Sequence, residues 1–194
     1  MDIKNHKNLT ISSKHSFNNL PEWFQFAETL NAVVSFENSQ LCWLDGDWRN
    51  GTWHGSKWTI GTWRNGNWKN GIWYGGHWMT GKWWDGTWKE GVWKDGIWVQ
   101  GIWEQGIWFS GHWRKGTWIN GNWKRGAWHN GVWKNGIWNG GTWYDGIWAN
   151  GEWFPKDFLK HKISCTWKKG LWINGTFEGQ TCFGFNKDNK PIFG

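Results

Sequence analysis

The sequence predicts an all-β repeat protein built as a β-solenoid, and three observations lead to this prediction. Trp stands at every fifth position from Trp43 to Trp153, in 23 consecutive five-residue units. Gly stands two positions before Trp in 21 of these units, with Leu41 and Ser56 as the exceptions. Side chains of a strand alternate between two faces, so an odd repeat cannot form one continuous strand. Every unit must therefore contain a turn, as in a repeat architecture with a short fixed period.

Each unit is predicted to be a short strand, Gly-x-Trp, followed by a two-residue corner. The residue before Trp is Thr, Val or Ile in 13 of 23 units, which favours a strand. The residue before the next Gly is Asn, Asp or Gly at 14 of 22 positions, and these residues tolerate the positive φ of tight turns. Gly and Trp share one face of the strand, so we expect both to point inward, with Gly leaving room for the indole.

Two architectures satisfy this unit: a four-faced solenoid with about 20 residues per rung, and an antiparallel meander. Stacked faces should place like side chains above one another, and steps of four units do this for the residue after Trp. One column is then mostly apolar and two are basic: Thr59, Met79, Val99 and Ile119; Arg49, Lys69 and Lys89; and Lys94, Arg114 and Lys134. The four-faced solenoid with Trp inward is therefore preferred over the meander.

The array resembles the pentapeptide-repeat proteins. Gly51 and Trp53, and their equivalents through Gly151 and Trp153, occupy the inward positions of that family's unit. The resemblance implies a right-handed quadrilateral β-helix, although Trp replaces the family's Leu or Phe and Thr, Ile or Val replaces its usual Asp or Asn. A weaker resemblance to MORN repeats, at 74–81 and 144–151, implies a MORN-like meander.

The chain is expected to divide into four segments: an N-terminal cap with a short helix (1–40), the repeat array (41–153), an insertion loop (154–164), and degenerate terminal repeats with a C-terminal cap (165–194). The helix is expected within 18–34, where Asn18 or Asn19 can cap it. Apolar residues there recur at helical spacing: Leu20, Trp23, Phe24, Ala27, Leu30 and Val34. Such a helix would cover the exposed end of the core.

Charge and cysteine content indicate which partners and which cellular compartment to expect. The 22 Lys and Arg exceed the 15 Asp and Glu, and a net charge of +7 favours nucleic acid, nucleotides or anionic surfaces as partners. Cys42, Cys165 and Cys182 show no paired spacing, which indicates a reducing compartment. No apolar leader or membrane-spanning run is visible, so we expect an intracellular, cytoplasmic protein without signal peptide or transmembrane segment, or one associated with a virion.

No catalytic combination of residues is visible, so we expect no enzyme, no cofactor and no metal. The histidines lack the spacing of metal ligands. The Trp ladder could stack on sugars or bases, but so many indoles in water would be too costly, and we expect them to form the core.

Three sets of outward residues are candidates for binding. An apolar interface, with self-association as one outcome, is predicted at Met79, Ile97, Val99, Ile119 and Ile137. Anion binding is predicted at Lys94, Arg114, Lys115, Lys124, Arg125 and Lys134. Outward aromatic contacts are predicted at Tyr74, Trp84, Phe109 and Tyr144.

The function predicted first is that of a non-enzymatic repeat scaffold, which binds a macromolecular partner, foremost a protein, through its outer faces. Long arrays of this kind resemble proteins encoded by bacteria and bacteriophages, which implies such an origin. One alternative is a module for nucleotides, nucleic acid or glycans that uses the basic columns and outward aromatics. Another is attachment to a membrane surface, as the MORN resemblance implies.

Overall fold

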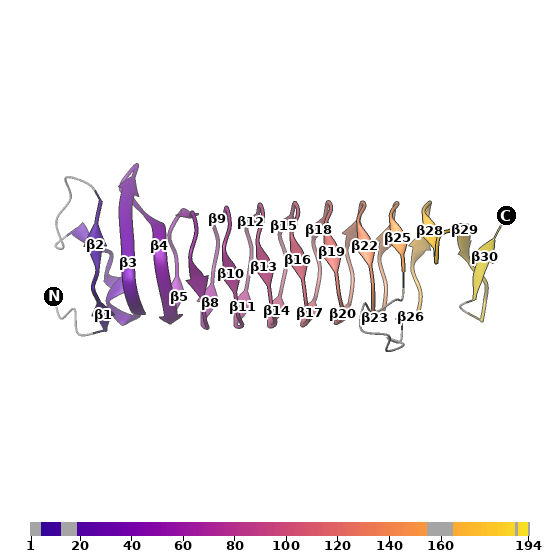
Figure 1. Cartoon of the computed structure of the whole chain (residues 1–194), viewed down its shortest axis with the longest axis horizontal. Helices are drawn as coiled ribbons and strands as arrows, with labels where there is room; N and C mark the ends of the chain where they lie inside the picture. Colours follow the sequence, from indigo (N-terminus) through magenta and orange to yellow (C-terminus); the bar gives the residue numbers. More distant parts are fainter. Residues whose placement is uncertain (1–4, 13–18, 155–164, 189, 194) are drawn as a thin grey trace.

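The computed structural model describes residues 5–12, 19–154, 165–188 and 190–193, and it shows an elongated β-solenoid of about seven turns (Figure 1). The rungs stack along the long axis, and the two termini lie at opposite ends. The all-β solenoid predicted from the Trp period is confirmed. The antiparallel meander is wrong for the array, because its neighbouring strands pair in parallel.

One rung consists of three five-residue units and has three faces, so the predicted rung of four units and four faces is wrong. Trp83 pairs with Trp68 on one side and Trp98 on the other, each three units away. Within a rung, consecutive indoles meet edge to face: the rings of Trp83 and Trp88 lie 6.0 Å apart at 71°. Three indoles in this arrangement fill the centre of a rung, so the bulk of Trp is accommodated with three side chains per turn.

The strands of the array form three faces, each stacked in parallel. Face 1 consists of β6 (Lys57–Trp58), β9 (Ile72–Trp73), β12 (Thr87–Trp88), β15 (Ile102–Trp103), β18 (Thr117–Trp118), β21 (Val132–Trp133), β24 (Ile147–Trp148) and β27 (Leu171–Trp172). Face 2 consists of β7 (Thr62–Trp63), β10 (His77–Trp78), β13 (Val92–Trp93), β16 (Ile107–Trp108), β19 (Asn122–Trp123), β22 (Ile137–Trp138), β25 (Glu152–Trp153) and β28 (Thr176–Phe177). Face 3 consists of β5 (Thr52–Trp53), β8 (Asn67–Trp68), β11 (Lys82–Trp83), β14 (Ile97–Trp98), β17 (His112–Trp113), β20 (Ala127–Trp128), β23 (Gly141–Trp143) and β26 (Cys165–Trp167). The longer β4 (Gln40–Asn50) begins faces 1 and 2, because it pairs with both β6 and β7.

The core is three continuous stacks of indoles, as expected from their inward placement. Every Trp from Trp43 to Trp153 that belongs to the five-residue period is at most 1% exposed. Successive rings of a stack are nearly parallel, as for Trp83 and Trp98, whose centroids are 4.8 Å apart at 5°. Both the stacked and the edge-to-face distances lie in the favourable range for aromatic pairs. Each indole between the end rungs therefore has ring partners above it, below it and within its own rung.

The repeating Gly serves the backbone first and also leaves room for Trp, since a Cβ built on Gly91 would lie 3.2 Å from Cζ2 of Trp88. Gly96 has a φ of 124°, and a Cβ built on it would lie 2.4 Å from the carbonyl oxygen of Gly81 in the rung below. Only Gly adopts that φ at low cost and allows the two backbones to approach so closely. The residue before it plays a different part: the Asp95 carboxylate accepts a hydrogen bond of 2.7 Å from the Gly96 N–H. Asn and Asp therefore precede Gly because they hold the corner, not because they adopt a positive φ themselves.

The N-terminal segment covers the first rung with strands instead of the predicted helix. Its described residues include the 3-10 helix η2 (Glu22–Phe26) and no α-helix. The following β3 (Glu28–Glu37) pairs antiparallel with β4, and β1 (His6–Lys7) and β2 (Thr10–Ile11) pair with β3 in parallel. The apolar residues at helical spacing do reach the core, since Leu20, Phe24, Ala27 and Val34 are buried. Within 28–37 the buried residues are Thr29, Ala32 and Val34, and pairing with β4 makes this segment a strand.

The C-terminal end continues the three stacks and then closes them. Trp167 stacks on Trp143 with centroids 5.1 Å apart, so the array stays in register across the predicted insertion loop 154–164, of which 155–164 lie outside the described residues. β29 (Gln180–Phe185) runs antiparallel to β28 and pairs with β30 (Pro191–Phe193). The ring of Phe185 lies 4.7 Å from Trp167 at 4°, and it ends that stack.

Candidate functional site

Each face of the solenoid presents two columns of outward side chains, one from the residue before Trp and one from the residue after it. Both residues lie in extended backbone on either side of the inward Trp, so they point away from the core. Neighbours in a column are three units apart in sequence and about 4.8 Å apart in space. The chemistry of a face can therefore be read by taking every third unit of the repeat.

Face 1 is the apolar face. Its column of residues before Trp is uncharged over seven rungs and mostly β-branched: Ile72, Thr87, Ile102, Thr117, Val132, Ile147 and Leu171. Ile102 is 42% exposed and Leu171 55%. Seven of the twelve exposed large hydrophobic side chains described between 41 and 177 belong to this face or the corner after it: Ile60, Tyr74, Ile102, Ile119, Ile147, Leu171 and Ile173. The second column contains the charges Lys89, Glu104 and Lys134, of which the first two form an ion pair of 2.5 Å.

Face 3 is the basic face. Its two outward columns contain Lys69, Lys82, Arg114 and Lys168, and no Asp or Glu among the described residues. The same columns contain the exposed rings of Trp84 and Tyr144. Lys82 and Lys69 place their Nζ atoms 3.7 and 4.5 Å from the centre of a Trp84 ring. This face therefore combines cations with aromatic surface.

A pair of histidines lies on the same face. The Nδ1 of His112 is 3.3 Å from the Nε2 of His129, and the ring of His129 stacks on Tyr144 with centroids 5.0 Å apart. Partial burial, together with nearby His112 and Arg114, lowers the pKa of His129. No group of three or more metal-binding side chains occurs in the described part of the chain.

Face 2 mixes charges of both signs. The Nε of Arg64 donates to the Asp47 carboxylate at 2.7 Å, and Lys94 lies 3.9 Å over the ring of Phe109. Asn139 is buried and donates to the carbonyl of Trp123 at 3.0 Å. Face 2 therefore carries both signs of charge, and one pair of them, Arg64 and Asp47, is joined in an ion pair.

The structure separates the five residues predicted as one apolar interface. Ile119 lies on face 1, while the others lie on faces 2 and 3: Met79 and Ile137 on face 2, and Ile97 and Val99 on face 3. The prediction failed because it stepped through the sequence by four units. A step of three units, applied to the residue before Trp, would have found the column on face 1.

The predicted anion site is separated in the same way. Lys94 and Lys124 follow Trp residues of face 2, and Arg125 lies at the corner after that face. Arg114 lies on face 3 with Lys115 at the next corner, and Lys134 lies on face 1. Lys94, Arg114 and Lys134 therefore do not stack. The four predicted outward aromatics are exposed, but they also occupy different faces: Tyr74 on face 1, Phe109 on face 2, and Trp84 and Tyr144 on face 3.

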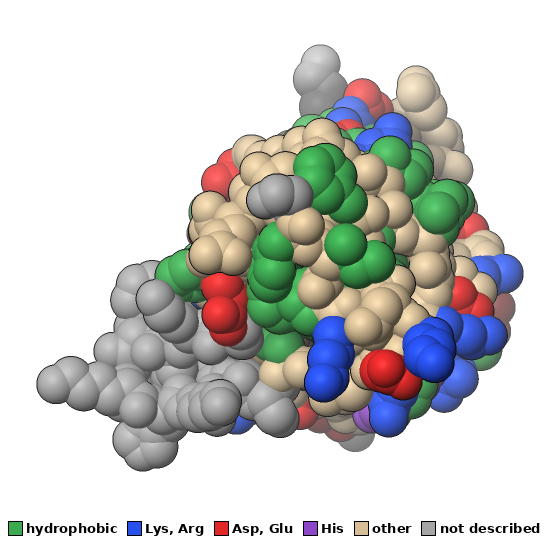
Figure 2. All heavy atoms as spheres, turned by 90° about the vertical axis from the view of Figure 1, so that its right-hand side faces the viewer, with side chains coloured by type: hydrophobic (Ala, Val, Ile, Leu, Met, Phe, Trp, Pro, Cys, Tyr) green, Lys and Arg blue, Asp and Glu red, His purple; other side chains and the backbone are tan. Residues whose placement is uncertain are grey.

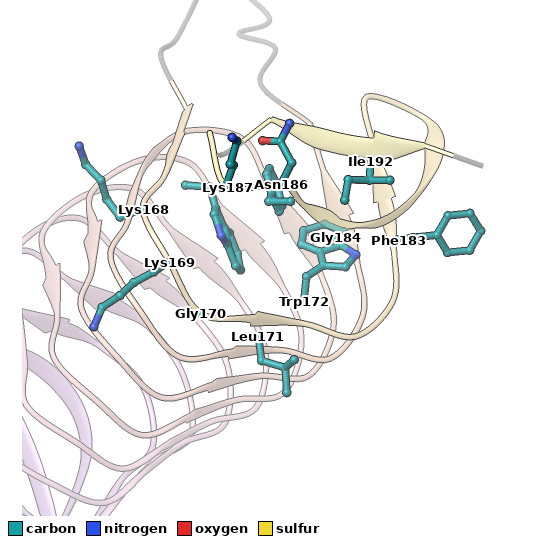
Figure 3. A pocket seen from close by; sticks show the side chains of 12 residues that line it. Lys168, Lys169, Gly170, Leu171, Trp172, Phe183, Gly184, Asn186, Lys187 and Ile192 are labelled. Atoms are coloured by element: carbon teal, nitrogen blue, oxygen red, sulfur yellow. The ribbon is translucent and has the colours of Figure 1, made fainter.

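A hollow with a volume of about 510 Å³ lies at the C-terminal end (Figure 3). Its lining includes Trp167, Trp172 and Phe185 together with three lysines. The Trp172 indole already donates to the carbonyl of Cys182 at 2.8 Å, and the Lys169 ammonium already pairs with Asp145 at 2.9 Å. Hydrophobic side chains also gather on the end of the molecule beside this hollow (Figure 2), where Phe183 and Ile192 are exposed.

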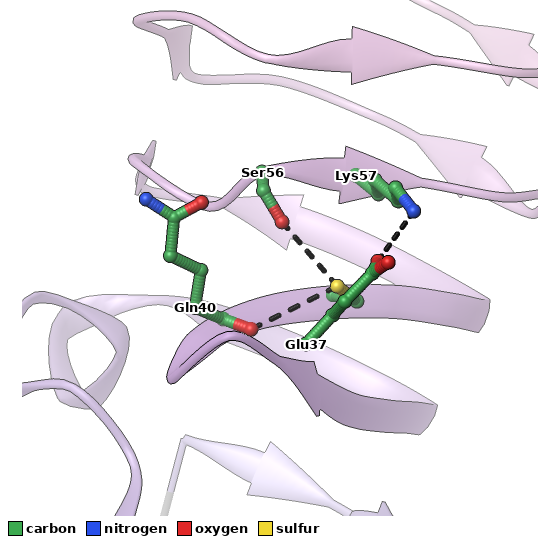
Figure 4. A network of polar contacts seen from close by, with 5 residues as sticks. Glu37, Gln40, Ser56 and Lys57 are labelled. Carbon is green, nitrogen blue, oxygen red and sulfur yellow. Dashed lines mark hydrogen bonds and ion pairs between the residues drawn. The ribbon is translucent and has the colours of Figure 1, made fainter.

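The three cysteines are all free, in agreement with the absence of a disulfide framework predicted from their spacing. Cys42 contacts the Ser56 hydroxyl at 3.3 Å, next to an ion pair between Lys57 and Glu37 that ties the cap to face 1 (Figure 4). Burial raises the pKa of Cys165 to about 12, and its thiol donates to the carbonyl of Asn139. This thiol is therefore held in its unreactive form.

Comparison with known proteins adds no relative to this description. No protein-family model, no curated protein and no solved structure matches the chain. The parallel stacked strands are compatible with the resemblance to pentapeptide-repeat proteins, but the three faces depart from the quadrilateral form that it implied. No helix among the described residues is long and apolar enough to cross a membrane.

Proposed function

We propose that this protein is a non-enzymatic scaffold that binds a protein partner along face 1. The observation that carries the proposal is the uncharged column from Ile72 to Leu171. Seven rungs at about 4.8 Å give it a length of about 29 Å, and the strand backbone beneath it is flat and hydrogen-bonded on both sides. An exposed apolar surface of this extent is typical of an interface.

The densely stacked core favours a static scaffold over a protein that changes conformation. Side chains of face 1 stand on strands whose inward neighbours are stacked indoles, so their spacing is set by the core. A surface whose side chains are already ordered loses little conformational freedom on binding. The partner expected here presents a mostly apolar surface with few charges, and face 1 of a second copy of this chain is one such surface.

Purification of tagged protein from its source cell tests the proposal. We expect the Ile102→Lys/Ile147→Lys variant to lose the partner that co-purifies with the wild type, because two buried ammonium groups would oppose docking. The matched control is Ile107→Lys/Ile137→Lys, which adds the same charge to the residue before Trp on face 2 and should retain the partner. Equal recovery by both variants would overturn the assignment to face 1.

Sedimentation then gives the mass of each purified protein, and this mass shows whether the partner is a second copy of the chain. If it is, the wild type and the control variant are dimers at the concentration used, and the face 1 variant is a monomer. A monomeric wild type with a co-purifying protein indicates a different partner on the same face.

A further inference from the structure

Face 3 differs from faces 1 and 2 in the sign and arrangement of its charge. Its outward columns contain four Lys or Arg and no acidic residue among those described, whereas the columns of face 2 contain Asp47, Glu152 and Glu178. Acidic residues lie at both corners that flank face 3: Asp95 at the preceding corner, where it accepts from the Gly96 N–H, and Asp85 and Asp145 at the following corner. Asp85 accepts from the Gly86 N–H, and Asp145 accepts from the Gly146 N–H and pairs with Lys169. The cations in the columns of face 3 are therefore without an acidic neighbour in those columns.

Aromatic rings lie in line with these cations. From Lys69 to Lys168, the column of residues after Trp contains Lys69, Trp84, Val99, Arg114, His129, Tyr144 and Lys168, one per rung. At about 4.8 Å per rung, this row is about 29 Å long. Trp84 is 36% exposed although two ammonium groups contact its rings, and the rings of His129 and Tyr144 stack on each other.

We propose that face 3 binds single-stranded nucleic acid along this row. Surfaces that bind single strands without regard to sequence combine a line of cations for the phosphates with aromatic rings on which bases stack. Trp84 is the stacking platform at one end of the row, and His129 with Tyr144 forms a second platform three rungs away. Lys69, Lys82 and Arg114 meet the phosphates. Face 3 is only two side chains wide between its corners, which suits a single strand better than a duplex.

The cation–π contacts of Trp84 are part of this site. Each ammonium group over the indole is held there by the ring at a modest energy, on the order of 1 kcal/mol for an exposed pair. An arriving base takes the place of one ammonium group over the ring, and that ammonium group then reaches the adjacent phosphate. A polyanion without bases would be bound by the cations alone, without any contribution from the rings.

The test measures binding of a fluorescein-labelled oligothymidylate of about 16 nucleotides by anisotropy, at salt concentrations between about 50 and 200 mM. We expect Lys69→Gln/Lys82→Gln/Arg114→Gln to weaken binding. Loss of three phosphate contacts should reduce the slope of log affinity against log salt by about 2. The matched control, Arg49→Gln/Lys94→Gln/Lys124→Gln, removes the same charge from face 2 and should change the slope by much less.

A second pair of variants separates stacking from charge. Trp84→Leu should weaken oligothymidylate binding about fivefold or more, and the matched change of an outward ring under a lysine on face 2, Phe109→Leu, should leave it unchanged. Heparin, which has no bases, should bind Trp84→Leu as well as the wild type. Absence of binding, equal loss in the face 2 variants, or an unchanged affinity of Trp84→Leu would each overturn the proposal. None of these measurements depends on the partner of face 1.

Discussion

Replacing Gly76 by Ala should destabilise the solenoid far more than replacing its neighbour Gly75. Gly76 has a φ of 108°, and a Cβ there would lie 2.3 Å from the carbonyl oxygen of Gly61 in the rung below. A Cβ on Gly75 would have only one atom near it, the carbonyl oxygen of Thr59 at 3.7 Å, which is ordinary contact. The two substitutions add the same methyl group to adjacent residues of one corner.

The expected difference follows from two costs. A non-Gly residue at that φ costs about 1–3 kcal/mol. The methyl group also enters a space about 1 Å too small, and such overpacking costs about 1–3 kcal/mol. Gly76→Ala should therefore lower the free energy of unfolding by about 2–6 kcal/mol. Gly75→Ala should change it by less than about 1 kcal/mol, because the new methyl group meets no obstacle and Ala also restricts the unfolded chain.

Guanidinium titration followed by Trp fluorescence measures both variants against the wild type. The comparison uses the midpoint and the slope together, because a changed slope would indicate a changed unfolded or partly folded state. A loss of less than about 1 kcal/mol for Gly76→Ala would refute the reasoning. It would mean that neighbouring rungs can separate enough to admit a methyl group.

Three further predictions concern the core, the cap and a thiol. Trp98→Ala, in the middle of a stack, should lower the free energy of unfolding by about 3–5 kcal/mol, and Trp84→Ala on the surface by much less, in the same titration. Desolvation lowers the pKa of the buried His6, so the cap should lose stability as pH falls below 6.5, because the unfolded chain then binds the proton more readily. His6→Phe should reduce this pH dependence in thermal melts between pH 7 and 5, and the part that remains includes His129, whose pKa is also lowered. Cys165, with a pKa of about 12, should resist a thiol-labelling reagent at about pH 8 in the folded protein and react once guanidinium unfolds it, whereas labelling at the same rate in both states would contradict its burial.

The inward placement of Trp could be predicted from the sequence because it depends on the repeat unit alone. An odd period with Trp in every unit requires a turn in each unit and burial of each indole, and Trp43 to Trp153 are buried accordingly. The number of units per rung depends on something else, the volume that the inward side chains fill together. Sequence spacing permitted three or four faces, and only the packing of indoles such as Trp83, Trp88 and Trp98 decides between them.

The candidate surfaces were mispredicted for the same reason. A column exists only relative to a rung length, so a step of four units joined Met79 to Val99 although they stand on different faces. The property of each residue was predicted well: Trp84 and Tyr144 point outward and are exposed. The residues that lie beside them in the neighbouring rungs were mispredicted, because the fold determines which residues are neighbours across rungs.

The N-terminal cap shows a different limit. The stripe from Leu20 to Val34 identified residues that become buried, but burial at spacings of three and four also fits a turn followed by a strand. The strand is stabilised by pairing with β4, a partner that lies outside the stripe. Local spacing alone could not include that pairing.

The requirements of the core and corners also explain why binding is expected on the outer faces. In each unit, stacking requires Trp, the left-handed corner requires Gly, and the corner is held best by Asn or Asp before that Gly. The residues before and after Trp are under none of these requirements, since both point to solvent. On face 1, seven consecutive rungs have an uncharged and mostly β-branched residue before Trp, and the columns of face 3 lack acidic residues among those described. These two patterns lie on the outward part of the repeat, and they are the basis for the two proposals, a protein partner on face 1 and a single strand of nucleic acid on face 3.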